Sequence, residues 1–426
     1  MPDLVADLRF RGLIHQVTDE AILERLDAGG VIVYAGFDPS APSLHVGSLL
    51  QLCTLRRLQQ GGNRPISLAG GATGLIGDPG GKTGERSLLS PVDLDANLAG
   101  IRRQLGQFLD LTDEAGDTQA LLLDNSAWLG EIGLIDFLRD VGKHFTVNQM
   151  VAKESVKARF ERPDQGISYT EFSYMLLQAY DFLRLHLDYG CDLQLGGSDQ
   201  WGNITMGIDL IKKVAGDEAY GLTTPLVLKA DGTKFGKTES GTVWLDPGRT
   251  SPYLLYQFFL NADDAVVGQY LRYFTFLTHE QIEALDVETA TRPERRAAQR
   301  AVAKAVCALV HGPEETERAE WASAVLFAEE IATLDEQTLL ALVDDAPSGI
   351  WTRRELGTLP LVDVLVASGL VSSKSDARRA ISQGGIYVNN RREPEAERVI
   401  RTEDLLHDRY VFLRRGRRDY HVLRFE

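Results

Sequence analysis

The sequence has few cysteines and no long apolar run. Its three cysteines, Cys53, Cys191 and Cys307, are far apart and odd in number, so they form neither a disulfide framework nor a metal-ligand spacing. No apolar stretch approaches the roughly 18–20 residues that cross a bilayer, and the acidic first residues do not resemble a secretory signal. These absences predict a protein of the reducing cytoplasm with no membrane partner and no metal site of its own.

Positively charged residues are also fewer than negatively charged ones. The 45 Lys and Arg residues against 61 Asp and Glu give a net charge of −16, which argues against nucleic-acid binding by the chain as a whole. From Trp351 to Glu426, however, 15 Lys and Arg face 11 Asp and Glu, so this tail carries +4 and the rest of the chain −20. A basic tail is compatible with local phosphate contact, although a solvated, arginine-rich surface has the same composition.

The 426 residues allow two or three domains, and the pattern begins with a strand–helix–strand unit. We expect strands over 31–35 and 65–69 and, between them, a helix over 44–60. This succession predicts parallel strands, with ligands bound beyond their carboxyl ends. Further helices are expected over 87–109, 132–139, 168–187 and 251–342, further strands over 193–195 and 225–228, and a linker over 344–349.

The segment Pro39–Ser48 has the composition of a helix start that contacts phosphate. We expect His45 at the helix N-terminus, where backbone N–H groups and the positive dipole end favour anions. Its imidazole N–H can stabilise charge growing on a phosphate oxygen, and Gly47 leaves room for an adenine ring. A lone His-x-Gly sequence is more typical of a capping loop with an incidental histidine.

A second motif, Lys234-Phe-Gly-Lys237-Thr238, places two ammonium groups on a glycine-containing loop. Such a mobile cationic clamp suits a pyrophosphate leaving group, whose charge rises in the transition state, and Thr238 can donate a further hydrogen bond. By itself, a Lys-x-Gly-Lys sequence is more typical of a solvated turn. Only its combination with the first motif indicates a nucleotide site.

The segment Gly196–Asn203 lies between the two motifs. Its glycines, Gly197 among them, permit close backbone approach; Asp199 offers a carboxylate to ribose hydroxyls, and Gln200 can reach an α-phosphate. The alternative interpretation is a tight turn, in which Gly, Ser, Asp and Asn are common.

The predicted helix 168–187 carries Tyr174, Gln178 and Asp181 on one face. This polar stripe contains no Lys or Glu, which favours a pocket wall over a solvent face. The nearby run Gly77–Thr83 resembles a phosphate-binding P-loop, but Ile76 occupies the place of the required first glycine. The sequence therefore disfavours a P-loop NTPase as an alternative, although Lys82 and Arg86 can still reach ATP phosphates.

Together these motifs resemble the bacterial-type tyrosyl-tRNA synthetases, which are class I aminoacyl-tRNA synthetases, over essentially the whole chain. Pro39–Ser48 matches the family's His-Ile-Gly-His region, and Lys234–Thr238 its Lys-Met-Ser-Lys-Ser region. Ser48 stands where the family has histidine, and its shorter reach alters the expected ATP contact. The resemblance also rests on Tyr34–Pro39, Gly70–Pro79, Val141–Phe145, Phe172–Met175, Gln178–Asp181 and Gly196–Asn203.

The resemblance implies an α/β protein: a Rossmann-like parallel-sheet nucleotide-binding catalytic domain, then an α-helical domain and a small α+β RNA-binding domain. The implied bounds are 1–228 for the catalytic domain that binds tyrosine and ATP, 229–345 for the Lys-Phe-Gly-Lys-Thr loop and helical domain, 346–358 for a linker and 359–426 for the C-terminal domain. The tail is similar to a module shared by a small-subunit ribosomal protein and some pseudouridine synthases. Its expected tRNA contacts are Lys374, Arg378, Arg379, Arg414, Arg415, Arg417 and Arg418.

The resemblance further implies the roles of individual residues. Tyr34 and Asp181 are expected to bind the phenolic hydroxyl of tyrosine. The residues expected to hold its amino group are Asp78, Tyr174 and Gln178. Those expected to bind ATP are Asp38, Ser40, His45, Gly47, Ser48, Gly197, Asp199, Gln200, Lys234 and Lys237. Those expected to act in catalysis are His45, Lys82, Arg86, Gln200, Lys234, Lys237 and Thr238.

The implied activity is that of a tyrosine–tRNA ligase, which forms tyrosyl-adenylate and transfers the tyrosyl group to the 3′-terminal ribose of tRNA(Tyr). ATP enters as a substrate with Mg²⁺, no cofactor is bound tightly, and the protein is a cytoplasmic homodimer. A tryptophanyl synthetase is an alternative that Tyr34 and Asp181 argue against. A non-catalytic RNA-binding protein is another, which the intact 196–203 and 234–238 segments argue against.

Overall fold

The computed structural model describes residues 3–78, 89–153, 156–157, 166–233, 235–238, 241–326, 331, 347–416 and 419–426. The chain divides into two compact units. The first comprises Met1–Arg249 with Asp263–Ala298, and the second Thr250–Ala262 with Gln299–Glu426. The domain bounds inferred from the sequence stay a prediction. In the described part of the chain, no helix has the length and apolar composition needed to cross a membrane.

The first unit is built on a six-stranded sheet in the order β1-β6-β5-β2-β3-β4. Strands β2 to β6 pair in parallel, whereas β1 pairs antiparallel with β6 at one edge. The strand order changes direction between β2 and β5, which is where open parallel sheets bind ligands. The strands are β1 (Gln16–Val17), β2 (Ile32–Phe37), β3 (Arg64–Ala69), β4 (Leu121–Asp124), β5 (Leu193–Gly197) and β6 (Tyr220–Thr224).

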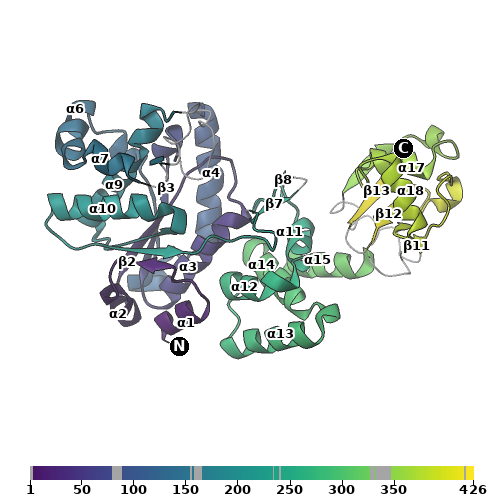
Figure 1. Cartoon of the computed structure of the whole chain (residues 1–426), viewed down its shortest axis with the longest axis horizontal. Helices are drawn as coiled ribbons and strands as arrows, with labels where there is room; N and C mark the ends of the chain where they lie inside the picture. The colour runs from purple at the N-terminus through teal and green to yellow at the C-terminus, as the bar shows by residue number, and fades with distance from the viewer. Residues whose placement is uncertain are drawn as a thin grey trace. The chain divides into compact units, whose positions relative to one another are not determined.

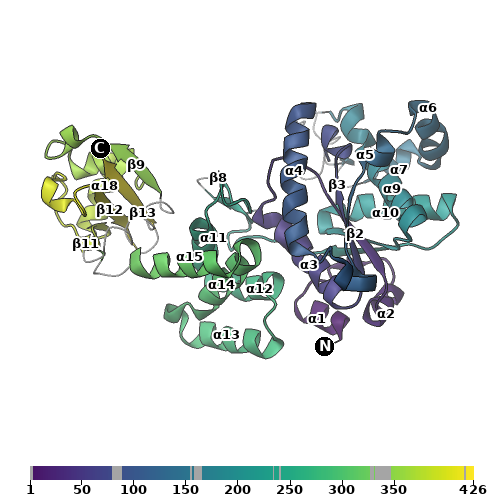
Figure 2. The same cartoon turned by 180° about the vertical axis from the view of Figure 1, so that it is seen from behind.

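Helices cover both faces of this sheet. In both views the strands lie between α4 on one side and α9 and α10 on the other (Figures 1 and 2). Phe182 of α9 and Met206 of α10 pack with Tyr34 of β2 in one apolar core. The helices of this unit are α1 (Leu4–Phe10), α2 (Ala21–Ala28), α3 (Leu49–Gln60), α4 (Pro91–Phe108), α5 (Ser126–Leu129), α6 (Leu134–Asp136), α7 (Val147–Val151), α9 (Tyr169–Tyr189), α10 (Trp201–Val214), α12 (Asp264–Phe274) and α13 (His279–Thr291), and a hairpin is formed by β7 (Lys237–Thr238) and β8 (Gly241–Thr242).

The local sequence explains where the pocket-forming helix α9 begins and ends. The Ser168 hydroxyl accepts a hydrogen bond from the Glu171 backbone N–H, which caps the first turn. Gly190 ends the helix with a φ of 69°, a left-handed conformation that glycine adopts without steric cost. Asp181 therefore lies in the interior of a well-defined helix.

The second unit contains α11 (Pro252–Leu260), most of α14 (Ala297–His311), α15 (Pro313–Leu326) and a C-terminal sheet. This sheet has the order β11-β10-β12-β13-β9 and packs its own apolar core against two helices. Strand β9 uses residues that the sequence assigned to the linker and pairs in parallel with β13. The elements are β9 (Ser348–Trp351), α17 (Leu361–Ala367), α18 (Lys374–Ser382), β10 (Ile386–Val388), β11 (Arg391–Arg392), β12 (Tyr410–Arg415) and β13 (Asp419–Phe425).

The predicted fold class is confirmed, whereas some predicted elements are wrong. No strand forms over 225–228; β6 ends at Thr224, because Pro225 has no N–H group to continue the ladder. The predicted helix over 132–139 is only the short α6 followed by a π-helical turn, Phe137–Val141. Strand β4 and helix α10 were not predicted.

Candidate active site

A pocket of about 370 Å³ lies at the carboxyl ends of β2, β3 and β5, with residues of α9 along its wall. The helix stripe Tyr174, Gln178 and Asp181 faces this pocket. Residues that are far apart in the sequence therefore meet where the strand order changes. The predicted site residues that line the pocket are Tyr34, Asp38, Ser40, Gly47, Ser48, Asp78, Tyr174, Gln178, Asp181, Gly197, Asp199 and Gln200.

The hydroxyl of Tyr34 is buried in the pocket wall. The residue is 1% exposed, and its hydroxyl oxygen has no hydrogen-bond partner among the described residues. Burial, with a smaller contribution from the negative charge of Asp181, raises the pKa of Tyr34 well above its ordinary value. The hydroxyl thus remains protonated. Since a buried unpaired hydroxyl is costly, the site favours a ligand with a polar atom at this point.

The carboxylate of Asp181 is held by two donors. Asn125 Nδ2 donates to Oδ2 over 3.0 Å, and Trp128 Nε1 donates to Oδ1 over 2.7 Å. Burial raises the pKa of Asp181 to about 7, while the two donors oppose this rise by favouring the ionised form. The result is an oriented acceptor beside a protonated phenol.

Asn125 and Trp128 were not among the site residues predicted from the sequence. The apolar run Leu121–Leu123 could have indicated a strand, and polar residues directly after a strand in this fold are candidate site residues. The sequence does not indicate that either residue contacts Asp181.

Another part of the pocket is rich in hydrogen-bond acceptors. Asp38 accepts hydrogen bonds from the Tyr174 hydroxyl at 2.8 Å and from Thr73 Oγ1 at 2.9 Å. Asp78 accepts from Gln200 Nε2 at 2.7 Å. Two carboxylates in one small pocket suit a ligand that carries a positive charge, such as an ammonium group.

The first motif forms a turn at the start of α3. His45 precedes the 3₁₀ turn Val46–Ser48, and its Nδ1 accepts a hydrogen bond from Gly47 N at 3.0 Å. A neutral imidazole in this arrangement carries its proton on Nε2, which is then the donor. A Cβ atom added to Gly47 would lie 2.7 Å from His45 Cε1. The missing side chain at Gly47 therefore leaves room for the histidine ring; Gly47 also lines the pocket, and its expected contact with an adenine ring stays a prediction.

The structure brings the second motif next to the first. Val46 N donates to Val243 O at 3.1 Å, and a Cβ atom added to Gly236 would lie 2.7 Å from Val46 Cγ2. Strands β7 and β8 pair Lys237 with Thr242. For Lys237 and Thr238 only the backbone is described, and Lys82, Arg86 and Lys234 lie outside the described residues.

The basic residues of the C-terminal sheet and helices have partners within the same unit. Arg414 lies over the Tyr387 ring, 3.8 Å from its centroid. Ion pairs between exposed side chains contribute little stability, so Lys374, Arg378 and Arg379 can exchange their partners for phosphate, whereas the Arg415–Asp376 pair is partly buried. The ion pairs are Lys374–Asp363, Arg378–Glu397, Arg379–Asp376 and Arg415–Asp376, whereas Arg417 and Arg418 lie outside the described residues.

Known proteins resemble the chain over its full length. Residues 27–328 match the family described as tRNA synthetases class I (W and Y), and residues 340–423 match the tyrosine–tRNA ligase SYY-like C-terminal domain. The tyrosine–tRNA ligase of Roseiflexus castenholzii is 54% identical over 100% of both chains. That of Geobacillus stearothermophilus is 52% identical over 99% of this chain and 100% of its own. A C-terminally truncated mitochondrial tyrosyl-tRNA synthetase from Aspergillus nidulans has a TM-score of 0.69 and 34% identity, and the match covers 77% of this chain and 95% of that one.

Proposed function

This chain belongs to the tyrosine–tRNA ligase family of class I tRNA synthetases, and on that premise we propose that it activates L-tyrosine with ATP and transfers it to tRNA(Tyr). In the first step the tyrosine carboxylate attacks the α-phosphate of ATP, and the bond to the β-phosphate breaks. The products are tyrosyl-adenylate and pyrophosphate. In the second step a 3′-terminal ribose hydroxyl of the tRNA attacks the acyl carbonyl, and AMP leaves.

The observation that carries this proposal is the pair formed by Tyr34 and Asp181. The Tyr34 hydroxyl has no partner among the described residues, and Asp181 is an acceptor whose direction is fixed by Asn125 and Trp128. A phenolic hydroxyl can accept from the first and donate to the second. A phenylalanine side chain would leave both groups unpaired in a buried site, which is costly.

The remainder of the pocket supports an α-amino acid and a nucleotide. In this proposal Asp78, Gln178 and Tyr174 hold the amino group, and Asp38, Ser40, Gly47, Ser48, Gly197, Asp199 and Gln200 bind ATP. His45 donates to a phosphate oxygen through Nε2, which stabilises charge that grows in the transition state. Lys82, Arg86, Lys234, Lys237 and Thr238 bind the pyrophosphate.

Magnesium enters with ATP in this proposal. Within the described ranges, no group of three or more His, Cys, Asp and Glu side chains is placed to hold a metal ion. Carboxylates such as Asp38 and Asp78 accept hydrogen bonds from neighbouring side chains. The chemistry expected of Mg²⁺ is to neutralise the phosphate oxygens of the nucleotide.

Exposed apolar side chains support a homodimer. Leu134 and Ile135 of α6, Val147 of α7 and Tyr169 of α9 are 72%, 71%, 64% and 75% exposed, and these helices occupy the same region of the first unit (Figure 1). Such a surface is typical of a subunit interface. Replacement of Ile135 by Asp is expected to yield monomers in sedimentation velocity, and an unchanged sedimentation coefficient would contradict this assignment.

The proposal places the enzyme in the cytoplasm and assigns tRNA contact to the C-terminal basic residues. Helix α18 carries three exposed basic side chains, Lys374, Arg378 and Arg379. Contact with phosphate requires such exposure. Arg414, Arg415, Arg417 and Arg418 are proposed to extend this surface. Contacts with phosphate strengthen as the salt concentration falls, so tRNA binding should be salt-dependent.

Pyrophosphate exchange into ATP, measured with each amino acid in turn, tests the first step. We expect exchange with tyrosine alone. Exchange with tryptophan instead would indicate the related specificity, and no exchange with any amino acid would favour a non-catalytic RNA-binding protein. Charging of tRNA with labelled tyrosine tests the second step.

A further inference from the structure

Phe235 anchors the second motif in an aromatic cluster. Its side chain is 7% exposed, although it lies between Lys234 and Lys237 in the sequence. Its ring stacks on Phe274 with 5.3 Å between centroids and an interplanar angle of 15°, and its centroid is 5.0 Å from that of Tyr270. Both partners belong to α12.

Helix α12 also holds the residues before this motif. The Tyr270 hydroxyl donates to the backbone oxygen of Leu228 at 3.1 Å. Gly232 and Gly236 both have positive φ values, 77° and 84°, and a glycine gives the backbone at each of these positions more conformational freedom than other residues would. Two attachments to one helix restrict this freedom and thereby reduce the entropy that must be lost when the motif closes on phosphate.

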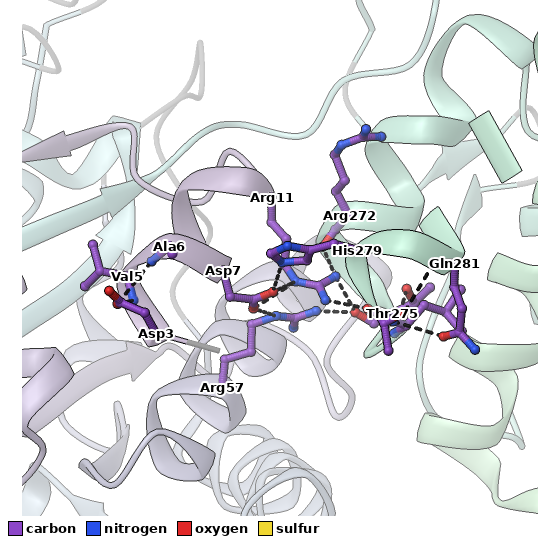
Figure 3. Close-up of polar contacts among 12 residues, drawn as sticks. Asp3, Val5, Ala6, Asp7, Arg11, Arg57, Arg272, Thr275, His279 and Gln281 are labelled. Atoms are coloured by element: carbon purple, nitrogen blue, oxygen red, sulfur yellow. Dashed lines mark hydrogen bonds and ion pairs between the residues drawn. The ribbon is translucent and has the colours of Figure 1, made fainter. Parts of the chain in front are cut away.

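Two arginines from other helices grip the carboxyl end of α12 (Figure 3). Arg11, at the end of α1, donates to the backbone oxygens of Arg272 at 3.2 Å, Thr275 at 3.1 Å and Leu277 at 2.6 Å. Arg57 of α3 also donates to Thr275 O. The last carbonyls of a helix lack intrahelical donors and carry the negative end of its dipole, so cations are favourable there.

The carboxylate of Asp7 lies beside both arginines and offsets part of their buried positive charge. Arg11 and Arg57 are each only 4% exposed. Asp7 lies 2.8 Å from Arg11 Nε and 3.5 Å from Arg57 Nε, and it also contacts His279 Nε2 at 2.8 Å. The Phe276 ring covers the Arg57 guanidinium at 4.2 Å. These contacts of Arg11 and Arg57 attach α12 to α1 and α3, although Arg57 Nε itself makes no hydrogen bond among the described residues.

Helix α3 thus links both motifs: it begins at the His45–Ser48 turn, and its Arg57 holds the helix that anchors Phe235. We propose that α12, gripped by Arg11 and Arg57, positions the Lys234–Thr238 segment for pyrophosphate departure, and that Phe235 and Tyr270 are the positioning residues. This inference rests on the proposed ATP-dependent activation of tyrosine. Neither ring lines the pocket described above.

The test compares two tyrosines of the same helix. Tyr270→Phe removes the hydroxyl that donates to Leu228 O, whereas the matched control Tyr273→Phe removes a hydroxyl that accepts a hydrogen bond from Gln269 within α12 at 3.0 Å. Phe235→Leu removes the ring stacking but keeps an apolar side chain. For each full-length variant, single-turnover kinetics give the rate of tyrosyl-adenylate formation, and equilibrium titration gives the Kd for tyrosine.

We expect Tyr270→Phe and Phe235→Leu to slow adenylate formation about fivefold, the factor that corresponds to one ordinary hydrogen bond for Tyr270 and to one aromatic pair for Phe235. The Kd for tyrosine should not change, and Tyr273→Phe should behave as the parent protein. Arg11→Lys keeps the charge but has fewer hydrogen-bond donors. This variant should also slow adenylate formation without changing the Kd for tyrosine.

Parent-like rates in both Tyr270→Phe and Phe235→Leu would overturn the inference. So would a parallel loss of tyrosine binding in these variants, because that result would indicate a general structural role. Absence of exchange in the parent protein would instead refute the proposed function, so the two failures can be told apart.

Discussion

The indole nitrogen of Trp128 donates a 2.7 Å hydrogen bond to the carboxylate of Asp181. Trp128 lies on α5, just after the edge strand β4, and Asp181 lies in the interior of α9. The bond therefore ties the sheet edge to the pocket wall and fixes the direction of the carboxylate. A rigid acceptor discriminates between ligands by the position of their hydroxyl group. The shape of the pocket alone discriminates less strongly.

Tyr34→Phe is expected to weaken the preference for tyrosine over phenylalanine. The change removes a hydroxyl but keeps the ring, which contacts Phe182 with 5.2 Å between centroids. Loss of one hydrogen bond of roughly 1 kcal/mol should lower the ratio of the two kcat/KM values about fivefold. Exchange assays with both amino acids give this ratio, and an unchanged value would refute the assigned contact.

Tyrosine binding is expected to weaken as the pH falls below 7. Burial raises the pKa of Asp181 to about 7, and the ionised carboxylate is the acceptor that the phenol needs. Above this pH the Kd should be constant, and below it the Kd should rise about tenfold per pH unit, because protonation competes with binding. In Asp181→Asn this dependence should be lost at a uniformly weaker affinity. A parent-like pH profile in that variant would contradict the assignment.

Trp128→Phe should weaken tyrosine binding and raise the pH below which the Kd for tyrosine begins to increase. The variant leaves Asp181 with Asn125 as its donor, so the ionised form is less favoured and the pKa of Asp181 rises further. A bond to a charged group contributes roughly 1.5–3 kcal/mol, so the Kd should rise at least about tenfold near neutral pH. Trp201→Phe, a change outside the pocket lining, is the matched control, and equal losses in both variants would count against the contact.

Gly47→Ala should slow adenylate formation without weakening tyrosine binding. The added methyl group would lie 2.7 Å from His45 Cε1 and would displace the imidazole ring. Gly106→Ala on α4 is a control, because its nearest contact would be 3.4 Å. Single-turnover rates and tyrosine titrations measure the two effects. A full activation rate in Gly47→Ala would show that the position of His45 matters little.

Deletion of the residues after Gly349 should spare tyrosine activation but impair tRNA charging. The apolar core of the C-terminal sheet is formed by residues 361–425, and the core around Tyr34 contains none of them. Exchange and charging assays on the truncated protein separate the two steps. Full charging activity would mean that the basic tail has another role.

Apolar runs and helical periodicity were sufficient to predict the parallel sheet, whereas pocket residues such as Tyr34, Asp38 and Asp78 were predicted only through the resemblance to the synthetase family. Strand β6 was misplaced, because the prediction followed the apolar run Leu226–Leu228 and overlooked the strand-favouring Tyr and Thr residues of Tyr220–Thr224. Asn125 and Trp128 were missed because their partner lies 56 and 53 positions away. The role of Gly47 beside His45 depends on a ring orientation that no sequence pattern encodes.

Among the described residues the Tyr34 hydroxyl has no hydrogen-bond partner, so a ligand that supplies one is expected to stabilise the folded chain. An amino acid that binds only the folded chain shifts the folding equilibrium toward the folded state and thereby reduces proteolysis of the enzyme. A cell starved of tyrosine would therefore lose intact enzyme molecules as well as substrate, and its capacity to resume translation would depend on how long the shortage lasted.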